Sequence, residues 1–323
     1  MNNGIVVVVL AAGVSYGTPL LFASLGELLA ERAGVLNLGV EGMMLVGAVL
    51  GFWSVQRVGG PTALVLAVGI AVAALAGAAM AAIHAFLTIT LRASQIISGL
   101  ALTLFAGAAG LSSYLGDDLG LGGSPAKHQF NDVNAFGLQK LAIVGPIVFG
   151  QPILVYVAWG CVVAIWFYLS RTRVGLNLRA VGESPAAADA MGINVTAYRY
   201  AHVLAGGAFA GIAGASFSLS LTPQWVGGGA LTNGAGWIAI ALVIFAFWRP
   251  ELCLVGACFF GALQALPPNL QARHELSSVP SDVFNALPYV MTVVVLVLVS
   301  TGFAKRRLGA PAALGVPYVR EER

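Results

Sequence analysis

The sequence predicts an all-α integral membrane protein, a polytopic bundle of about 8–10 transmembrane helices, and three observations support this. Of the 323 residues, 59% are hydrophobic and 9% are charged, and the mean hydropathy is +0.89, whereas about a quarter of the residues in a soluble domain are charged. Apolar runs of about 20 residues recur, which is long enough to cross a bilayer as a helix. These runs are continuous rather than alternating, which favours helices over the barrel that lipid also permits.

We expect nine spans, provided that the short apolar runs at 235–248 and 252–268 each cross the membrane. The remaining seven are predicted at 5–25, 36–56, 62–91, 94–115, 151–170, 200–221 and 283–301. The chain starts without a basic region or a small-residue cleavage site, so we expect the first span to be retained. The cysteines fall inside apolar runs without metal or redox spacing, and we interpret Cys161, Cys253 and Cys258 as small hydrophobic residues.

A long polar loop at 171–202 fixes the predicted orientation. It contains four arginines, and basic loops beside membrane spans stay in the cytoplasm. The N-terminus and the loop 116–150 then fall outside, and the tail 303–323 falls inside. The net charge of +3 follows from this asymmetry between loops and does not indicate a nucleic-acid partner. A lone histidine in the external loop, His128, is interpreted as a surface residue rather than a metal ligand.

The middle of the polar loop predicts a short helix. Ser184 is a favoured N-cap residue, Pro185 suits the first helical position, and alanines follow. Gly192 is placed to end the helix. A capped helix in a cytoplasmic loop indicates a docking element rather than a simple linker.

The order G-L-N-L-R-A-V-G-E-S-P-A-A-A-D-A-M-G-I-N-V, from Gly175 to Val195, resembles the coupling loop of one group of ABC importer permeases. That group transports branched-chain amino acids, simple sugars and nucleosides. The resemblance implies that the loop contacts the ATPase subunit and passes its closure to the membrane domain. The residues implied in ATPase coupling are Gly182, Glu183, Ser184, Pro185, Ala188, Met191 and Gly192. The alternative is an ordinary solvated loop.

A second stretch, E-L-L-A-E-R-A-G-V-L-N-L-G-V-E-G-M-M-L-V-G-A from Glu27 to Ala48, resembles the nucleoside-type permeases of the same group. Charged residues at membrane depth are costly and usually face a cavity or a partner. We therefore expect Asn37 and Glu41 beside the translocation path, with packing as the alternative. For Glu27, Glu31 and Arg32 we favour a cytoplasmic turn with an ion pair between neighbours.

Two further segments carry the resemblance and supply the other predicted pathway residues. Ser94 to Phe105 resembles a pore-facing helix, and Thr232 to Ala246 resembles another. The predicted pathway positions on them are Gln95, Ser98, Thr103, Asn233 and Trp237. Family members often have Asn where this chain has Thr103 and Arg where it has Ala235, which puts a charge-based role at the latter position in doubt. Such hydroxyls and amides also commonly bond their own or a neighbouring helix.

Small residues repeat at four-residue spacing at Gly206, Ala210 and Gly214, which places them on one helix face for close approach of a neighbour. We interpret this face as packing inside the subunit, with an interface between subunits as the alternative.

The function predicted from the resemblance is that of the membrane-spanning permease subunit of an ATP-driven ABC importer in the inner membrane of a bacterial-type cell. Nucleosides are the favoured cargo and simple sugars the alternative. No G-x-x-x-x-G-K-[ST] phosphate loop occurs, and we expect no catalytic or metal site, so the chain is not expected to be an enzyme. An ion-coupled secondary transporter with Glu41 as a proton site is the alternative from another class.

The resemblance also implies the partners. These are two ATPase subunits that bind ATP and Mg, a second permease chain, and an external solute-binding protein. The nucleoside-type systems suggest that the second permease is a paralogue. We expect no cofactor in this chain itself.

Overall fold

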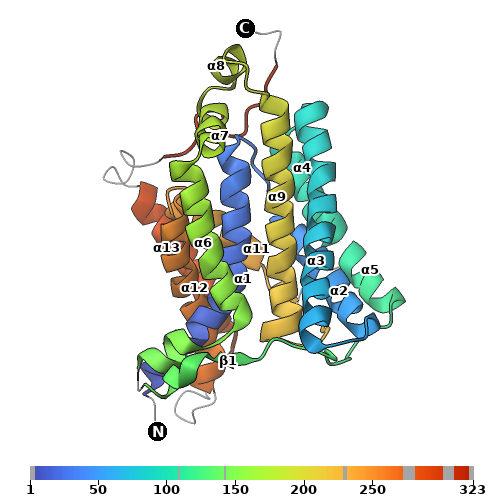
Figure 1. The fold of residues 1–323 in the computed structure, drawn as a ribbon, viewed down its shortest axis with the longest axis vertical. Coiled ribbons are helices and arrows are strands. Elements are labelled where there is room, and N and C mark those ends of the chain that lie inside the picture. Colours follow the sequence, from blue (N-terminus) through green and yellow to red (C-terminus); the bar gives the residue numbers. More distant parts are fainter. Residues whose placement is uncertain are drawn as a thin grey trace.

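The computed structural model describes residues 4–107, 110–141, 143–227, 231–271, 281–300 and 309–319. These form a bundle of long helices with a small antiparallel ribbon, in which β1 (Asp132–Asn134) pairs with β2 (Gly150–Pro152). The start of α1 and the ribbon lie at one end of the bundle, and α8 lies at the other (Figure 1). This separation agrees with the predicted placement of loops 116–150 and 171–202 on opposite sides.

The elements follow the chain in an order close to the predicted spans. They are α1 (Ile5–Arg32), α2 (Val40–Arg57), α3 (Thr62–Ala85) with the π-helical turn η1 (Phe86–Thr90), α4 (Gln95–Ala106), α5 (Leu111–Asp118), η2 (Ala135–Lys140), η3 (Gly145–Phe149), α6 (Ile153–Arg171), α7 (Arg173–Glu183), α8 (Pro185–Ala190), α9 (Val195–Ser216) with the π-helical turn η4 (Phe217–Leu221), α11 (Ala235–Phe245), α12 (Pro250–Gln271) and α13 (Ser281–Ser300).

Within the described residues, six helical stretches are long and apolar enough to cross a membrane, judged by length and composition. They lie in α1, α3, α4 with α5, α6, α9 and α12. The helices α2, α11 and α13 occupy the other three predicted spans. The prediction of an all-α polytopic membrane protein is confirmed.

The helix α11 is shorter than a complete span. Its 11 residues rise about 16 Å at 1.5 Å per residue, roughly half the thickness of the hydrocarbon layer. This helix is therefore too short to cross the layer alone. The prediction of a span at 235–248 located this helix but did not show that it is too short to cross the membrane alone.

Close contacts between small residues hold the centre of the bundle together. A Cβ at Gly211 would lie 2.0 Å from the carbonyl oxygen of Ala73 in α3, and one at Gly214 would lie 1.8 Å from that of Met44 in α2. A larger residue at either position would force the helices apart. The face of small residues on α9 therefore packs inside the subunit, as the sequence favoured.

The interpretation of Glu27, Glu31 and Arg32 as a cytoplasmic turn is wrong. All three lie in the last turns of α1, and both glutamates are 1% exposed. The indole N–H of Trp248 donates to the carboxylate of Glu31, and Arg32 donates to the carbonyl of Trp248 at 2.9 Å. These partners follow α11, more than 200 residues along the chain, so local sequence could not reveal them.

Candidate translocation site

The non-helical segment 33–39 and the turn at 233–234 each interrupt the helices, and the helices that follow them begin beside one carboxylate. Segment 33–39 leads into α2, and residues 231–234 lead into α11. Glu41, in the first turn of α2, accepts hydrogen bonds from the Thr232 hydroxyl at 2.6 Å, the Gly234 N–H at 3.1 Å and the Gly236 N–H at 2.6 Å. Glu41 therefore caps the start of α11 from a different helix.

The physical basis of this cap is the unsatisfied N–H groups at a helix start. These groups carry a partial positive charge that favours a carboxylate nearby. Within a bilayer, water cannot take over the role of the carboxylate as hydrogen-bond acceptor. Glu41 is 7% exposed, and it stands at the start of α2 as well as that of α11. A Cβ at Gly236 would lie 2.7 Å from the Glu41 Cα, so glycine is needed for this approach.

Segment 33–39 has its backbone groups paired by side chains of the surrounding helices. The amide oxygen of Gln95 accepts from the Leu36 N–H at 2.7 Å, and the Thr103 hydroxyl donates to the Leu38 carbonyl at 2.8 Å. His84 in α3 lies 3.1 Å from the Leu36 carbonyl through one ring nitrogen. Its other ring nitrogen lies 3.0 Å from the hydroxyl of Ser98.

Asn37 shapes the same segment from within. Its side-chain oxygen accepts from the Gly39 N–H at 2.9 Å, and its backbone N–H donates to the carboxylate of Glu27 at 2.9 Å. Asn37 is 1% exposed. It thus stabilises the turn that places Glu41 at the start of α2.

The predicted pathway residues are therefore brought together in two groups. Asn37, Gln95, Ser98 and Thr103 gather around segment 33–39. Glu41 and Asn233 lie at the start of α11, and Trp237, on the first turns of that helix, is 38% exposed. Whether the first group also lines a path in another conformation stays a prediction.

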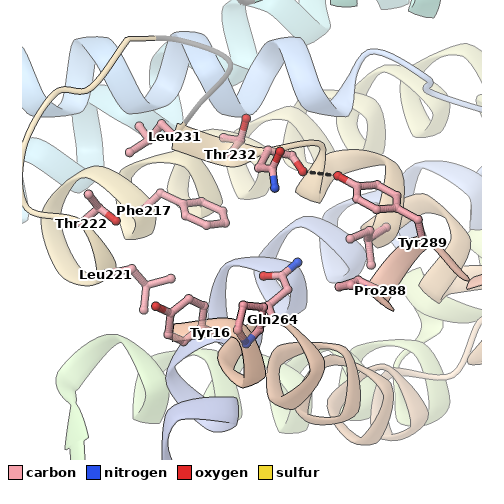
Figure 2. A pocket seen from close by; sticks show the side chains of 12 residues that line it. Tyr16, Phe217, Leu221, Thr222, Leu231, Thr232, Gln264, Pro288 and Tyr289 are labelled. Atoms are coloured by element: carbon pink, nitrogen blue, oxygen red, sulfur yellow. Dashed lines mark hydrogen bonds between the residues drawn. The ribbon is translucent and has the colours of Figure 1, made fainter. Parts of the chain in front are cut away.

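Beside the start of α11 lies a partly open cavity of about 210 Å³, lined by residues of α1, η4, α11, α12 and α13 and of the segment before α11. Figure 2 shows Phe217, Gln264 and Tyr289 reaching into it from three elements, with the Tyr289 hydroxyl bonded to the Asn233 carbonyl. Its polar lining residues are Tyr16, Thr222, Thr232, Asn233, Gln264 and Tyr289, and its apolar ones are Phe217, Leu221, Leu231, Ile238, Pro267 and Pro288.

The chemistry of this lining suits an uncharged ligand. Hydroxyls, two amides and three aromatic rings face the space, and the lining contains no Asp, Glu, Lys, Arg or His. The carboxylate behind them, Glu41, is already bonded to α11. A free amino acid would leave its ammonium and carboxylate groups without charged partners in this cavity, at a high desolvation cost. A neutral molecule with hydroxyl groups and a flat face would find donors, acceptors and rings.

Tyr16 places the cavity close to the middle of α1, which spans Ile5–Arg32. Transporter sites typically occur at this depth, next to broken helices. Sequence analysis missed Tyr16, Gln264 and Tyr289. Gln264 gave a usable signal, because an amide inside the apolar run 252–268 needs a partner or a cavity.

At the opposite end from the ribbon, the predicted short helix is present as α8 (Figure 1). It begins with Ser184 at the N-cap and Pro185 at the first position, although the serine side chain makes no capping bond. It ends before Gly192, which has a φ of +81°. Ala188 is buried and Met191 is 82% exposed, so Met191 stands out from the surface beside the helix.

Gly182 and Glu183 connect this region to the rest of the molecule. A Cβ at Gly182 would lie 2.2 Å from the carbonyl oxygen of Arg32, so the end of α7 is pressed against the end of α1. The carboxylate of Glu183 accepts from the Ala312 N–H at 3.4 Å.

Comparisons with known proteins decide the family. The model of a family described as "Branched-chain amino acid transport system / permease component" matches residues 9–299. The chain belongs to this family. No solved structure matches it.

Several curated relatives match almost the whole chain. It is 44% identical to the putative glucose ABC transporter permease protein TsgC13 of Haloferax volcanii, with 97% of each chain covered. It is 33% identical to the nucleoside ABC transporter permease protein NupC of Lactococcus lactis, and 33% identical to the guanosine ABC transporter permease protein NupQ of Bacillus subtilis. Each of these two matches covers 98% of both chains.

The chain is therefore an ABC transporter permease subunit, a multi-pass protein of the cell membrane. The alternative of an ion-coupled secondary transporter is set aside.

Proposed function

We propose that this subunit forms part of the translocation path of an ATP-driven importer, and that its cargo is a nucleoside. The observation that carries the proposal is the uncharged, aromatic and amide-lined cavity beside the Glu41 cap. Aromatic rings stack on the flat face of a base, and amides and hydroxyls match its polar edge and the ribose hydroxyls. Relatives named for nucleoside and guanosine transport support this choice.

A simple sugar is the second candidate. The relative that is 44% identical is named a putative glucose permease. A sugar would use the same neutral donors and acceptors, with its ring packed on an aromatic face. Amino acids, which the family description also mentions, fit this cavity less well because they carry two charges.

The energy would come from separate ATPase subunits that bind ATP and Mg and dock on α8. The short helix at this end of the bundle and the exposed Met191 beside it support this docking role. ATPase closure would then move α8 and, through Gly182 pressed on Arg32, the end of α1. Nucleotide shifts such an equilibrium only by its differential affinity for the two states.

The second permease is proposed to be a paralogue, and an external solute-binding protein would deliver cargo at the opposite end. Two guanosine permease proteins of Bacillus subtilis match this chain, at 33% and 26% identity. Two glucose permease proteins of Haloferax volcanii match it at 44% and 29%. Such pairs within one organism support a heterodimer.

Uptake by the complete transporter tests the cargo. Cells without their own nucleoside and glucose uptake would express the transporter, and entry of labelled guanosine, uridine and glucose would be followed with and without ATP depletion. We expect ATP-dependent nucleoside uptake that falls when Gln264 is changed to Leu. Uptake of glucose alone would favour the sugar, and uptake of neither class would contradict the proposal.

A further inference from the structure

The chain ends, within the described residues, in a segment that crosses the α8 end of the bundle. We call residues 309–319 the C-terminal strap. It forms turns rather than a helix over 312–315, yet it makes hydrogen bonds to three parts of the molecule: the end of α1 with segment 33–39, the end of α7 with α8, and α9. The tail had no assigned role in the sequence analysis.

The first set of contacts ties the strap to the end of α7 and to α8. The Ala313 N–H donates to the Gly182 carbonyl at 2.9 Å, and the Ala312 N–H donates to the Glu183 carboxylate at 3.4 Å. The Tyr318 hydroxyl donates to the Asp189 carboxylate in α8 at 2.9 Å. The Tyr318 ring also packs against the small apolar cluster that contains Ala188.

The second set ties the strap to the end of α1 and to segment 33–39. The Gly315 N–H donates to the Gly34 carbonyl at 3.3 Å, and Arg32 lies 3.4 Å from the Gly309 carbonyl. Gly34 is the second residue of the segment that leads to Glu41. The strap thus reaches from α8 to the segment that positions the start of α2.

A third contact fixes the strap to α9. Arg199 is 1% exposed and donates from its guanidinium to the Val316 carbonyl at 3.1 Å. A buried cation needs hydrogen-bond acceptors, and the strap supplies one and covers the side chain.

We propose that the C-terminal strap is a coupling element that carries movement of α8 to segment 33–39, with Tyr318 as the positioning residue at its α8 end. The inference rests on the proposed docking of the ATPase on α8. It adds a second connection from α8 to the membrane domain, beside the direct one through α7. Hydrogen bonds at Gly34, Asp189 and Arg199 hold this connection to three separate elements.

The test uses the assembled transporter in proteoliposomes and measures cargo taken up per ATP hydrolysed. Tyr318→Phe removes only the hydroxyl that reaches Asp189. Tyr114→Phe is the control, because Tyr114 is 66% exposed on α5, away from α8 (Figure 1). We expect Tyr318→Phe to keep the ATPase subunit bound and to lower cargo per ATP by about tenfold, as loss of a bond to a charged acceptor predicts.

A second variant ends the chain after Leu308 and so removes the whole strap. We expect a larger fall in cargo per ATP than for Tyr318→Phe. An unchanged ratio in both variants would overturn the proposal. So would a loss of thermal stability with an unchanged ratio, because that result is expected of a merely structural contact.

Met191→Asp tests the docking proposal separately, because it places a charge on the exposed residue beside α8. Loss of the ATPase subunit on purification supports docking there. Retention of the ATPase subunit by this variant would contradict docking at this residue, whatever amount of cargo per ATP the strap variants take up.

Discussion

The two segments that interrupt the bundle meet at Glu41 but are held in different ways. Segment 33–39 is fixed by side chains of α1, α3 and α4 that bond its backbone groups. Residues 231–234 are held at Glu41 and by Tyr289, and three of them, Leu231 to Asn233, line the cavity. The surrounding helices therefore hold the shape of the first segment, so that it can move only together with its supports, and the second is the side on which a ligand would be bound.

Similar substitutions are therefore expected to have different effects in the two segments. Substitutions around segment 33–39 should act on stability, substitutions around the cavity should act on transport, and Glu41 should affect both.

The largest effect is expected from Glu41→Ala. It removes the acceptor of three hydrogen bonds, two of which, from the Thr232 hydroxyl and the Gly236 N–H, are buried, and one of which, from the Gly234 N–H, is partly buried. Because bonds to a charged group contribute about 1.5–3 kcal/mol each, we expect the free energy of unfolding to fall by at least that amount and uptake to be lost. Thermal unfolding of the purified complex measures it.

The matched control is Glu251→Ala. Glu251 pairs with Arg249 at 2.5 Å, but the two side chains are 38% and 60% exposed. Exposed pairs contribute about 0–1 kcal/mol, so stability should hardly change. Equal destabilisation by both variants would contradict the capping role of Glu41.

The next effect is expected from Gln95→Leu. It leaves the Leu36 N–H, bonded at 2.7 Å in the native protein, without its acceptor. An unsatisfied buried donor costs about 1–3 kcal/mol. We expect a lower midpoint of thermal unfolding with an unchanged KM for cargo. The neighbouring change Ile96→Leu, at a residue that is 52% exposed, should leave both values unchanged, and a raised KM for Gln95→Leu would place this residue on the path instead.

The smallest effect on stability is expected from Tyr289→Phe. Tyr289 is 41% exposed, and the variant loses one hydroxyl that donates to the Asn233 carbonyl, a bond that contributes about 0.5–1.5 kcal/mol. The KM for cargo should rise up to about tenfold with stability nearly constant. Tyr156→Phe loses a similar bond, 2.9 Å to the Val148 carbonyl, and should leave the KM unchanged. An unchanged KM for Tyr289→Phe together with a raised KM for Tyr156→Phe would contradict the placement of the cavity on the transport path.

Hydropathy and local signals predicted much of the fold. Continuous apolar runs identified the spans, and Ser184, Pro185 and Gly192 marked α8 within a residue of its observed ends. Both signals are local, because they depend on the transfer of side chains into lipid and on backbone conformation.

The candidate site was less predictable because its parts come from distant sequence. Polar residues inside apolar runs drew attention to Glu41 and Gln95, but their partners did not follow from local spacing. Thr232 lies 191 residues from Glu41, and the strap bonds of Glu183 and Asp189 each span 129 residues. The cavity likewise draws on α1, η4, α11, α12 and α13, so no single motif describes it.

The most direct test of the account is protection of a cysteine in the cavity by cargo. Cys161, Cys253 and Cys258 would first be changed to Ala in the assembled transporter, and Asn233→Cys or Leu36→Cys would then be introduced singly. A water-soluble thiol reagent should modify Asn233→Cys, and a nucleoside should slow that reaction while leaving the reaction of Leu36→Cys unchanged. Equal rates at Asn233→Cys with and without nucleoside or sugar, or protection of Leu36→Cys instead, would contradict the assignment of the cavity as the cargo site.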